Sequence, residues 1–267
     1  MGFLAGAPGD VAVGDLGHAH CATGAEAAAS EARSRGRLTL LFPRGQVIIF
    51  AKEPRPGRVK TRLRSLTDVQ AAEFARAGLL DTLWAASEIA RTTLEWDGAL
   101  ATVPALEPPL HVRLQSRGDL GQRMGAAFAA SVAEGSAWVV ALGTDSPGLP
   151  RTALEEAGAW LEQPGTPRAV LGPTEDGGYY LLGLSSWQPG LLDDLPWSQP
   201  TTRAATRARL ESHGYACREV EPYFDVDVPE DLERLARIWR AGALKAPATG
   251  RWLERWLSAR DDSPPEA

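Results

Sequence analysis

Two aspartates and two cations are the side chains of this sequence best suited to chemistry. Asp145 follows an apolar run, WVVALG, and Asp227 lies in the segment FDVDVPEDL. Lys60 and Arg62 follow a second apolar run. Carboxylates can hold Mg²⁺ together with phosphate oxygens, while lysine and arginine bind phosphate through charge-assisted hydrogen bonds. These residue types therefore indicate a site for a diphosphate and a divalent cation.

The loop that carries Lys60 reads EPRPGRVKTRL. Its prolines stiffen the chain, and Gly57 allows a tight turn before Arg58. Val59 stands where a Walker loop needs glycine before the lysine, so the loop is not of that type. Two interpretations remain open: a phosphate-binding loop or a solvated basic turn. Asp145, which precedes Ser-Pro, is likewise either a metal ligand or a turn aspartate, with Thr144 beside it.

Alternating apolar and acidic residues lead into FDVDVPEDL. We expect a strand to end here, which would place Asp225 and Asp227 on one of its faces as candidate metal ligands. Pro229 opens a helix in the usual way, and the acidic residues after it suit the positive end of the helix dipole.

A further candidate site is the stretch GPTEDGGYY. Glu175 and Asp176 could act as a general base or hold an acceptor. Gly177 and Gly178 permit close approach of the backbone to a ligand. The same Asp-Gly pair is also typical of a tight turn, so both interpretations stay open.

Strands must alternate with helices to bring these segments together. Apolar runs predict strands, and helical periodicity predicts the helices between them. Such alternation predicts an α/β fold with a mostly parallel sheet covered by helices on both faces. The expected strands are 47–50, 92–96, 111–114, 138–142, 169–171, 179–184 and one leading to Asp225; the expected helices are 69–89, 120–132, 152–161, 202–212, 229–240 and one carrying Trp252 and Trp256.

Composition narrows the class of protein. The net charge of -6 and the pI near 5.4 argue against a nucleic-acid partner. No stretch has the length of a membrane span, and the start lacks the features of a secretory signal. The two cysteines form no metal or disulfide pattern. We therefore expect a cytoplasmic protein without a membrane partner. His18, His20 and Cys21 have no second ligand cluster. We expect a poorly ordered extension over 1–44, a nucleotide-binding domain over 45–242 and a C-terminal helix with a frayed tail over 243–267.

The order of the motifs along the chain resembles a known family. FAKEPRPGRVKTRL, GDLGQRM, LGTDSPGL, LGPTEDGGYYLLGL, LPWSQP and FDVDVPEDL, which span about residues 46–240, resemble the bacterial arsenosugar-biosynthesis-type or radical-SAM/selenodomain-associated glycosyltransferases. The resemblance implies a GT-A-like (Rossmann-like) three-layer α/β/α fold with a mostly parallel mixed sheet. It implies that Lys60 and Arg62 face nucleotide phosphates and that Asp145, with Asp227 nearby, binds the metal. Gln199 and Val228 depart from the family pattern, where threonine is usual.

We therefore expect a glycosyltransferase that uses Mg²⁺ or Mn²⁺ and moves a sugar from a nucleoside diphosphate to a small acceptor. Nucleotidyl transfer from an NTP to a phosphorylated small molecule is the first alternative, and a non-catalytic nucleotide-sugar-binding protein is the second. Asp176, backed by Glu175, is the candidate catalytic group, and Tyr179 and Trp197 are candidate walls of the sugar or acceptor pocket. The candidate nucleotide-binding residues are Gly57, Arg58, Lys60, Arg62, Thr144, Gly177 and Gly178, and the candidate metal ligands are Asp145, Asp225 and Asp227.

Overall fold

A computed structural model of the chain describes residues 40–105 and 110–261. Contacts group the described residues into one compact unit. Most of the extension expected over residues 1–44, with His18, His20 and Cys21, lies outside the described residues, as does the end of the expected tail from residue 262 onward. None of the described helices is both long enough and apolar enough to cross a membrane.

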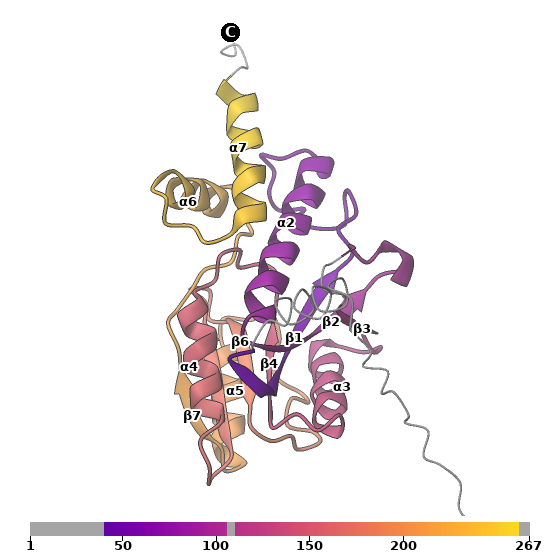
Figure 1. Ribbon diagram of the computed structural model, residues 1–267, viewed down its shortest axis with the longest axis vertical. Helices are drawn as coiled ribbons and strands as arrows, with labels where there is room; N and C mark the ends of the chain where they lie inside the picture. Colours follow the sequence, from indigo (N-terminus) through magenta and orange to yellow (C-terminus); the bar gives the residue numbers. More distant parts are fainter. Residues whose placement is uncertain (1–39, 106–109, 262–267) are drawn as a thin grey trace, which may run out of the picture. The chain divides into compact units, whose positions relative to one another are not determined.

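The described residues contain one seven-stranded sheet with the strand order β3-β2-β1-β4-β6-β5-β7 (Figure 1). β1 pairs in parallel with β2 and β4, and β3 and β7 continue the parallel pattern at the two edges. β6 runs antiparallel to both of its neighbours. The strands are β1 (Phe42–Lys52), β2 (Ala90–Asp97), β3 (His111–Leu114), β4 (Trp138–Leu142), β5 (Arg168–Pro173), β6 (Tyr179–Leu184) and β7 (Ala216–Glu219).

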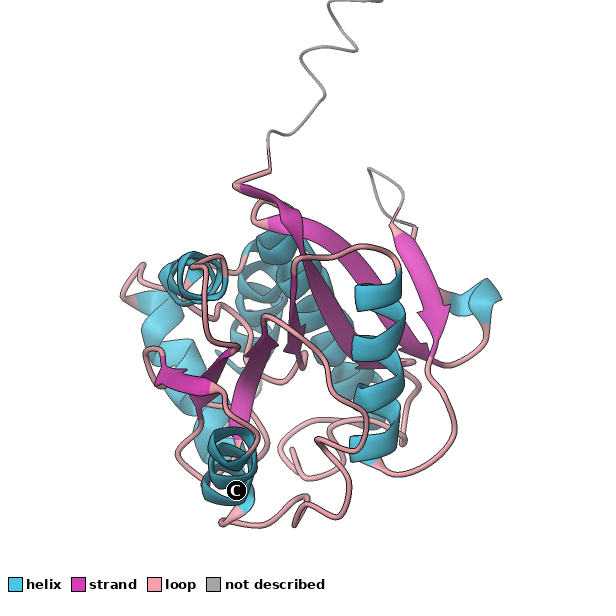
Figure 2. Cartoon of the chain, turned by 90° about the horizontal axis from the view of Figure 1, so that it is seen from below, coloured by secondary structure: helices cyan, strands magenta, loops and turns pink. Residues whose placement is uncertain are grey.

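Helices cover both faces of this sheet (Figure 2). α2 and α4 pack into the hydrophobic cluster on one face, whereas α3 and α5 pack into the cluster on the other. The mixed sheet between two helical layers confirms the predicted α/β/α architecture. The helices are α2 (Asp68–Ser87), α3 (Leu120–Ala133), α4 (Arg151–Leu161), α5 (Thr202–Ser212), α6 (Pro229–Arg240) and α7 (Pro247–Asp261), with a short 3₁₀ turn, η1, at Leu100–Thr102.

The two clusters follow from the alternation of side chains along each strand. In β1, Val47 and Ile49 belong to the cluster with α2 and α4, whereas Ile48 belongs to the other. β4 is buried along its whole length and contributes to both clusters in the same way. A strand covered on both faces needs a continuous apolar run, and this is why its position could be predicted so closely.

A third cluster holds α6 and α7 against one end of α2. Trp252 of α7 packs on Phe74 of α2, with ring centroids 5.0 Å apart. The cluster also buries Leu63, the residue that follows the basic loop. The far end of that loop is thereby fixed to the same packed layer as the helices.

The strand expected before α6 is present as β7, but it does not extend to Asp225 as predicted. β7 ends at Glu219, and in the following segment Tyr223 forms only an isolated bridge to Thr174. Phe224 and Val226 turn into the third cluster, so their apolar alternation reflects packing against helices rather than pairing in a sheet. The Val226 N–H donates to the carbonyl of Asp145 at 2.9 Å, which joins this segment to the loop after β4.

Candidate functional site

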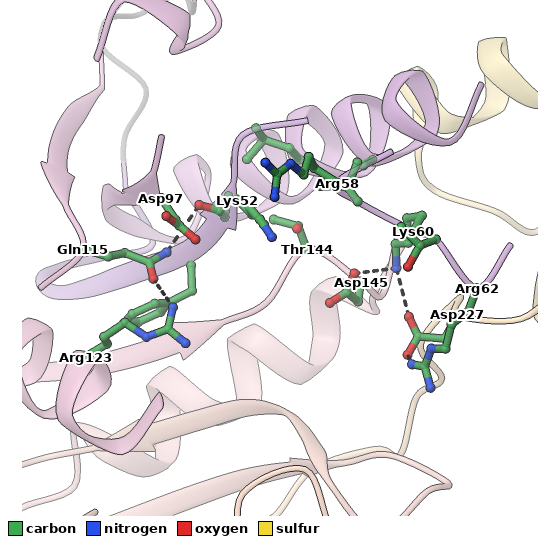
Figure 3. Close-up of a pocket in the computed structure, with 16 residues that line it drawn as sticks. Lys52, Arg58, Lys60, Arg62, Asp97, Gln115, Arg123, Thr144, Asp145 and Asp227 are labelled. Carbon is green, nitrogen blue, oxygen red and sulfur yellow. Dashed lines mark hydrogen bonds and ion pairs between the residues drawn. The ribbon is translucent and has the colours of Figure 1, made fainter. Parts of the chain in front are cut away.

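A cavity of about 520 Å³ opens where β1, β2, β3 and β4 end. Ligands of open α/β sheets bind at this carboxyl edge of the strands. Figure 3 shows the basic loop on one side of the cavity and the residues that follow β2 and β3 on the other. The polar and charged residues that line it are Lys52, Arg58, Lys60, Thr61, Arg62, Asp97, Gln115, Arg123, Thr144, Asp145 and Asp227.

Lys60 lies at the centre of the acidic residues of this site. Its Nζ is 2.8 Å from the carbonyl oxygen of Val226 and 3.4 Å from Asp227 Oδ1, and it forms an ion pair with Asp145 Oδ1. The backbone at Lys60 has φ 49°, in the left-handed region that few residues other than glycine adopt. The chain therefore turns at Lys60, whose ammonium joins the loop after β4 to the segment before α6.

Asp227 is held by contacts from three directions. Arg62 Nη2 pairs with its Oδ2, and Lys60 approaches its Oδ1. Its backbone N–H, together with that of Val228, donates to Asp231 Oδ2, each at 3.0 Å. Val228 supplies no side-chain cap, so Asp231 caps the first turn of α6 and fixes the backbone of Asp227.

Asp225 lies deeper than the other two aspartates. Ser146 donates a hydrogen bond to its Oδ1. Burial raises the pKa of Asp225 to about 6, against the lowering effect of the Ser146 hydrogen bond. The charge of Asp145 nearby raises this pKa further, and Lys60 lowers it. The charges of Asp145, Asp227 and the buried Lys60 ammonium therefore all act on the Asp225 carboxyl group.

A second cavity of about 500 Å³ adjoins the first and shares Arg62, Asp145 and Asp227 with it. Tyr179 and Trp197 form an aromatic wall, with ring centroids 6.5 Å apart in an edge-to-face arrangement. Burial raises the pKa of the Tyr179 hydroxyl well above its ordinary value. The other lining residues are Leu120, Thr174, Asp176, Gly178, Ser198, Gln199, Pro200, Thr202 and Asp225.

Asp176 lines the second cavity, and its side chain also holds a turn. Its Oδ1 accepts from Thr174 Oγ1 at 2.6 Å and from the Gly178 N–H at 3.0 Å. The Thr174 hydrogen bond is the main cause of a lowered Asp176 pKa. An ionised carboxylate with a lowered pKa is a weak base, but it accepts hydrogen bonds from hydroxyl groups well.

The structure gathers most of the predicted residues at these two cavities. Gly57, Glu175 and Gly177 line neither of them. Both oxygens of Glu175 accept from Arg234 at 2.9 Å, which directs this carboxylate to α6. Gly177 acts through its backbone instead, since its carbonyl accepts from the Arg203 N–H at 3.0 Å.

Five polar or charged residues of the first cavity were missed by the sequence analysis: Lys52, Thr61, Asp97, Gln115 and Arg123. Arg123 donates from Nη1 to Gln115 Oε1 at 2.7 Å, and Gln115 Nε2 donates to the carbonyls of Glu95 at 2.9 Å and Ala51 at 3.3 Å. Lys52 and Asp97 end β1 and β2, and Gln115 follows β3. The rule that ligands bind beyond strand ends could have found all three.

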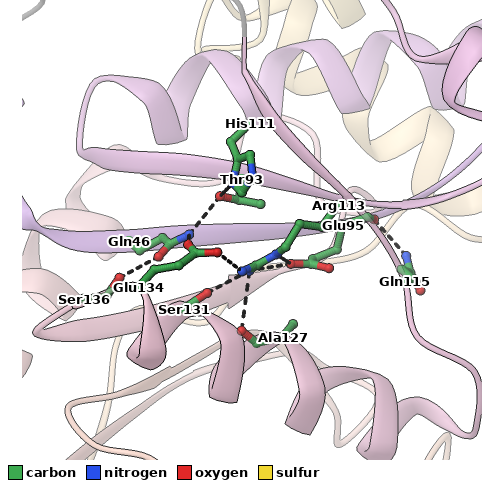
Figure 4. Close-up of polar contacts among 10 residues, drawn as sticks. All are labelled: Gln46, Thr93, Glu95, His111, Arg113, Gln115, Ala127, Ser131, Glu134 and Ser136. Carbon is green, nitrogen blue, oxygen red and sulfur yellow. Dashed lines mark hydrogen bonds and ion pairs between the residues drawn. The ribbon is translucent and has the colours of Figure 1, made fainter.

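A polar network holds β3, which Gln115 follows, and α3, which carries Arg123 (Figure 4). Arg113 of β3 donates to Glu95 Oε1 at 2.8 Å, to Glu134 Oε1 at 2.8 Å and to Ser131 Oγ at 2.8 Å. Burial raises the pKa of Glu95, and Arg113 opposes this effect. The network joins the edge of the sheet to α3 at the end away from Arg123.

Comparisons with known proteins were made for the sequence and for the structure. The model of a bacterial family described as "Uncharacterized protein conserved in bacteria (DUF2064)" matches residues 70–199, a segment that contains Asp145 and Asp176 but neither Lys60 nor Asp227. No curated protein matches the sequence.

Solved structures resemble this chain to different degrees. A "putative nucleotide-diphospho-sugar transferase" from Desulfovibrio desulfuricans G20 matches with TM-score 0.72 and 27% identity over 81% of this chain and 96% of that chain. The homologue of Mycobacterium tuberculosis rv0371c from Mycobacterium sp. strain JC1 gives TM-score 0.45 and 18% identity over 74% of this chain and 98% of that one. A Bacillus anthracis protein described as a "Putative Glucose-1-Phosphate Thymidylyltransferase" gives a TM-score of 0.45 and 13% sequence identity over 75% of this chain and 95% of that chain. The family match and the first structure together support the GT-A-like superfamily for this chain.

Proposed function

We propose that the protein is a metal-dependent glycosyltransferase that moves a sugar from a nucleoside diphosphate to a small acceptor. The observation that carries the proposal is the pair of adjacent cavities that meet at Arg62, Asp145 and Asp227. A nucleotide suits the first cavity, with its cations, and a sugar suits the second, with its aromatic wall and hydroxyl groups. The diphosphate then lies at the shared wall.

The residues at the shared wall fit a divalent cation only in part. No group of three or more His, Cys, Asp or Glu side chains among the described residues is arranged to hold a metal ion. Mg²⁺, however, is commonly held by one or two carboxylates plus substrate phosphates. Asp145 and Asp227, with Asp225 behind them, supply such carboxylates. A cation held there would neutralise charge on the departing diphosphate.

The chain's own residues have distinct roles in this proposal. Arg58, Arg62 and Arg123 bind phosphate oxygens or the nucleotide in the first cavity. Asp176 orients an acceptor hydroxyl by accepting its hydrogen bond, since its lowered pKa makes it a poor proton acceptor. Tyr179 and Trp197 contact the apolar face of a sugar ring.

Nucleotidyl transfer is the second candidate, and the number of cations favours it. Lys52, Arg58, Lys60, Arg62 and Arg123 all line the first cavity. A triphosphate carries more negative charge than the diphosphate of a nucleotide sugar, so it uses such a set more fully.

Titration calorimetry with UDP, GDP, ADP, CDP and dTDP in the presence of Mn²⁺ tests the proposal. We expect one of them to bind, and Asp145→Asn to lower its affinity at least tenfold. Glu155→Gln is the matched control, because Glu155 is a partly exposed carboxylate of α4 that pairs with Arg151 and lines neither cavity. Binding that is independent of Mn²⁺ and of Asp145, or no binding at all, would contradict the proposal.

A further inference from the structure

The ammonium of Lys60 has no N–H left for a ligand. An ammonium group has three donors, and three acceptors surround this one: the Val226 carbonyl, Asp227 Oδ1 and Asp145 Oδ1. The side chain is only 6% exposed. A lysine free to bind phosphate would instead extend into the cavity. Figure 3 shows it turned toward the two aspartates.

The same two carboxylates are the ones that a divalent cation needs. Both oxygens of Asp227 are already paired, one with Lys60 and one with Arg62. Asp145 uses one oxygen for Lys60. A divalent cation bound to Asp145 and Asp227 would share its ligands with the Lys60 ammonium, and like charges at such close range repel strongly.

We infer that Lys60 is an internal counter-ion that binds the Asp145–Asp227 pair before nucleotide arrives and that excludes free divalent cations from it. This inference rests on the proposed function in one respect: the phosphates of the nucleotide are what draw the ammonium away. Once Lys60 binds phosphate, the two carboxylates are free for the metal. Metal and nucleotide therefore bind together, each much more weakly without the other.

The structure of the basic loop allows the Lys60 ammonium to move from the carboxylates to a phosphate. Leu63 anchors it in the third cluster, and the Leu63 N–H donates to the Lys60 carbonyl at 3.0 Å. The left-handed backbone at Lys60 is therefore held on its C-terminal side. Only the flexible four-carbon side chain has to move for the ammonium to pass from the carboxylates to a phosphate.

Electron paramagnetic resonance of Mn²⁺ measures this directly, because the signal of free Mn²⁺ falls as the ion binds. We expect Lys60→Met to bind Mn²⁺ alone at least tenfold more tightly than the wild-type protein. Arg64→Met is the matched control: it removes an exposed cation four residues after Lys60, but Arg64 lines neither cavity, so Mn²⁺ affinity should change less than twofold. Lys60→Gln repeats the test if the methionine variant does not fold.

Adding the nucleoside diphosphates named above separates the two proposals. In the wild-type protein, the one that binds should raise Mn²⁺ affinity at least tenfold, and Lys60→Met should lose most of this gain. Equal Mn²⁺ affinity of Lys60→Met and wild type, while the wild type still binds a nucleotide, overturns the counter-ion role and leaves the proposed function standing. Tighter Mn²⁺ binding by Lys60→Met without nucleotide binding by any form supports the counter-ion role and refutes the proposed function.

Discussion

Replacing Gly177 by alanine is expected to destabilise the protein by about 3 kcal/mol. Gly177 has φ +87°, and a Cβ built on it would lie 2.1 Å from the backbone oxygen of Pro200. The left-handed conformation costs an L-residue about 1–2 kcal/mol. The clash adds about 1–3 kcal/mol, because a backbone atom must move rather than a flexible side chain. Pro200 lines the second cavity, so its shift would also alter the proposed sugar or acceptor site.

Gly135 provides a matched control for this substitution. It has the same φ of +87°, but a Cβ there would meet nothing within 4 Å. Gly135→Ala should therefore cost only the conformational part, about 1–2 kcal/mol. Urea unfolding of both variants measures the two free energies. Equal costs would refute the close contact between the β5–β6 turn and Pro200, and with it the shape assigned to the second cavity.

Three further predictions concern Asp81 and Gln115. Asp81→Ala should lower the free energy of unfolding by about 2–3 kcal/mol in urea, because its carboxylate accepts from the Ala248 and Thr249 N–H groups at the start of α7. Burial raises the pKa of Asp81 in the folded protein. The stabilising contribution of this pKa shift is therefore full below about pH 4 and is lost as the pH rises through the folded-state pKa. The free energy of unfolding, relative to that of Asp81→Asn, should fall from pH 4 to pH 7. Gln115→Met should weaken nucleotide binding about tenfold by calorimetry, since Arg123 loses its partner; unchanged affinity would contradict the positioning role of Gln115.

The sheet could be predicted from sequence because buried strands demand apolar residues. Trp138–Leu142 is buried throughout and was located to the residue. The predicted extension of a strand to Asp225 was wrong for a related reason. Phe224 and Val226 alternate with aspartates as they would in a strand, but they pack against α6 and α7. Periodicity reports which side of the chain is buried and not what buries it.

The candidate site was only partly predictable. A basic loop and several aspartates indicate an anion and a cation, and these residues do meet at one wall. That Lys60 would pair with the aspartates could not be foreseen, since it depends on the backbone turn at Lys60 and on the Val226 carbonyl. Arg123 lies within a helix, where its spacing shows only that it is polar. Its position in the cavity depends on Gln115, a residue of another element.

Phosphorus NMR of the purified protein tests the central claim most directly. The protein with Mg²⁺ is incubated with a panel of nucleotide sugars, and separately with nucleoside triphosphates plus sugar phosphates, each with a cell extract as the source of acceptors; Asp145→Asn is treated in parallel. Our account predicts that one nucleotide sugar releases its nucleoside diphosphate and that Asp145→Asn abolishes the release. Pyrophosphate that appears only with a triphosphate would contradict glycosyl transfer and establish nucleotidyl transfer instead.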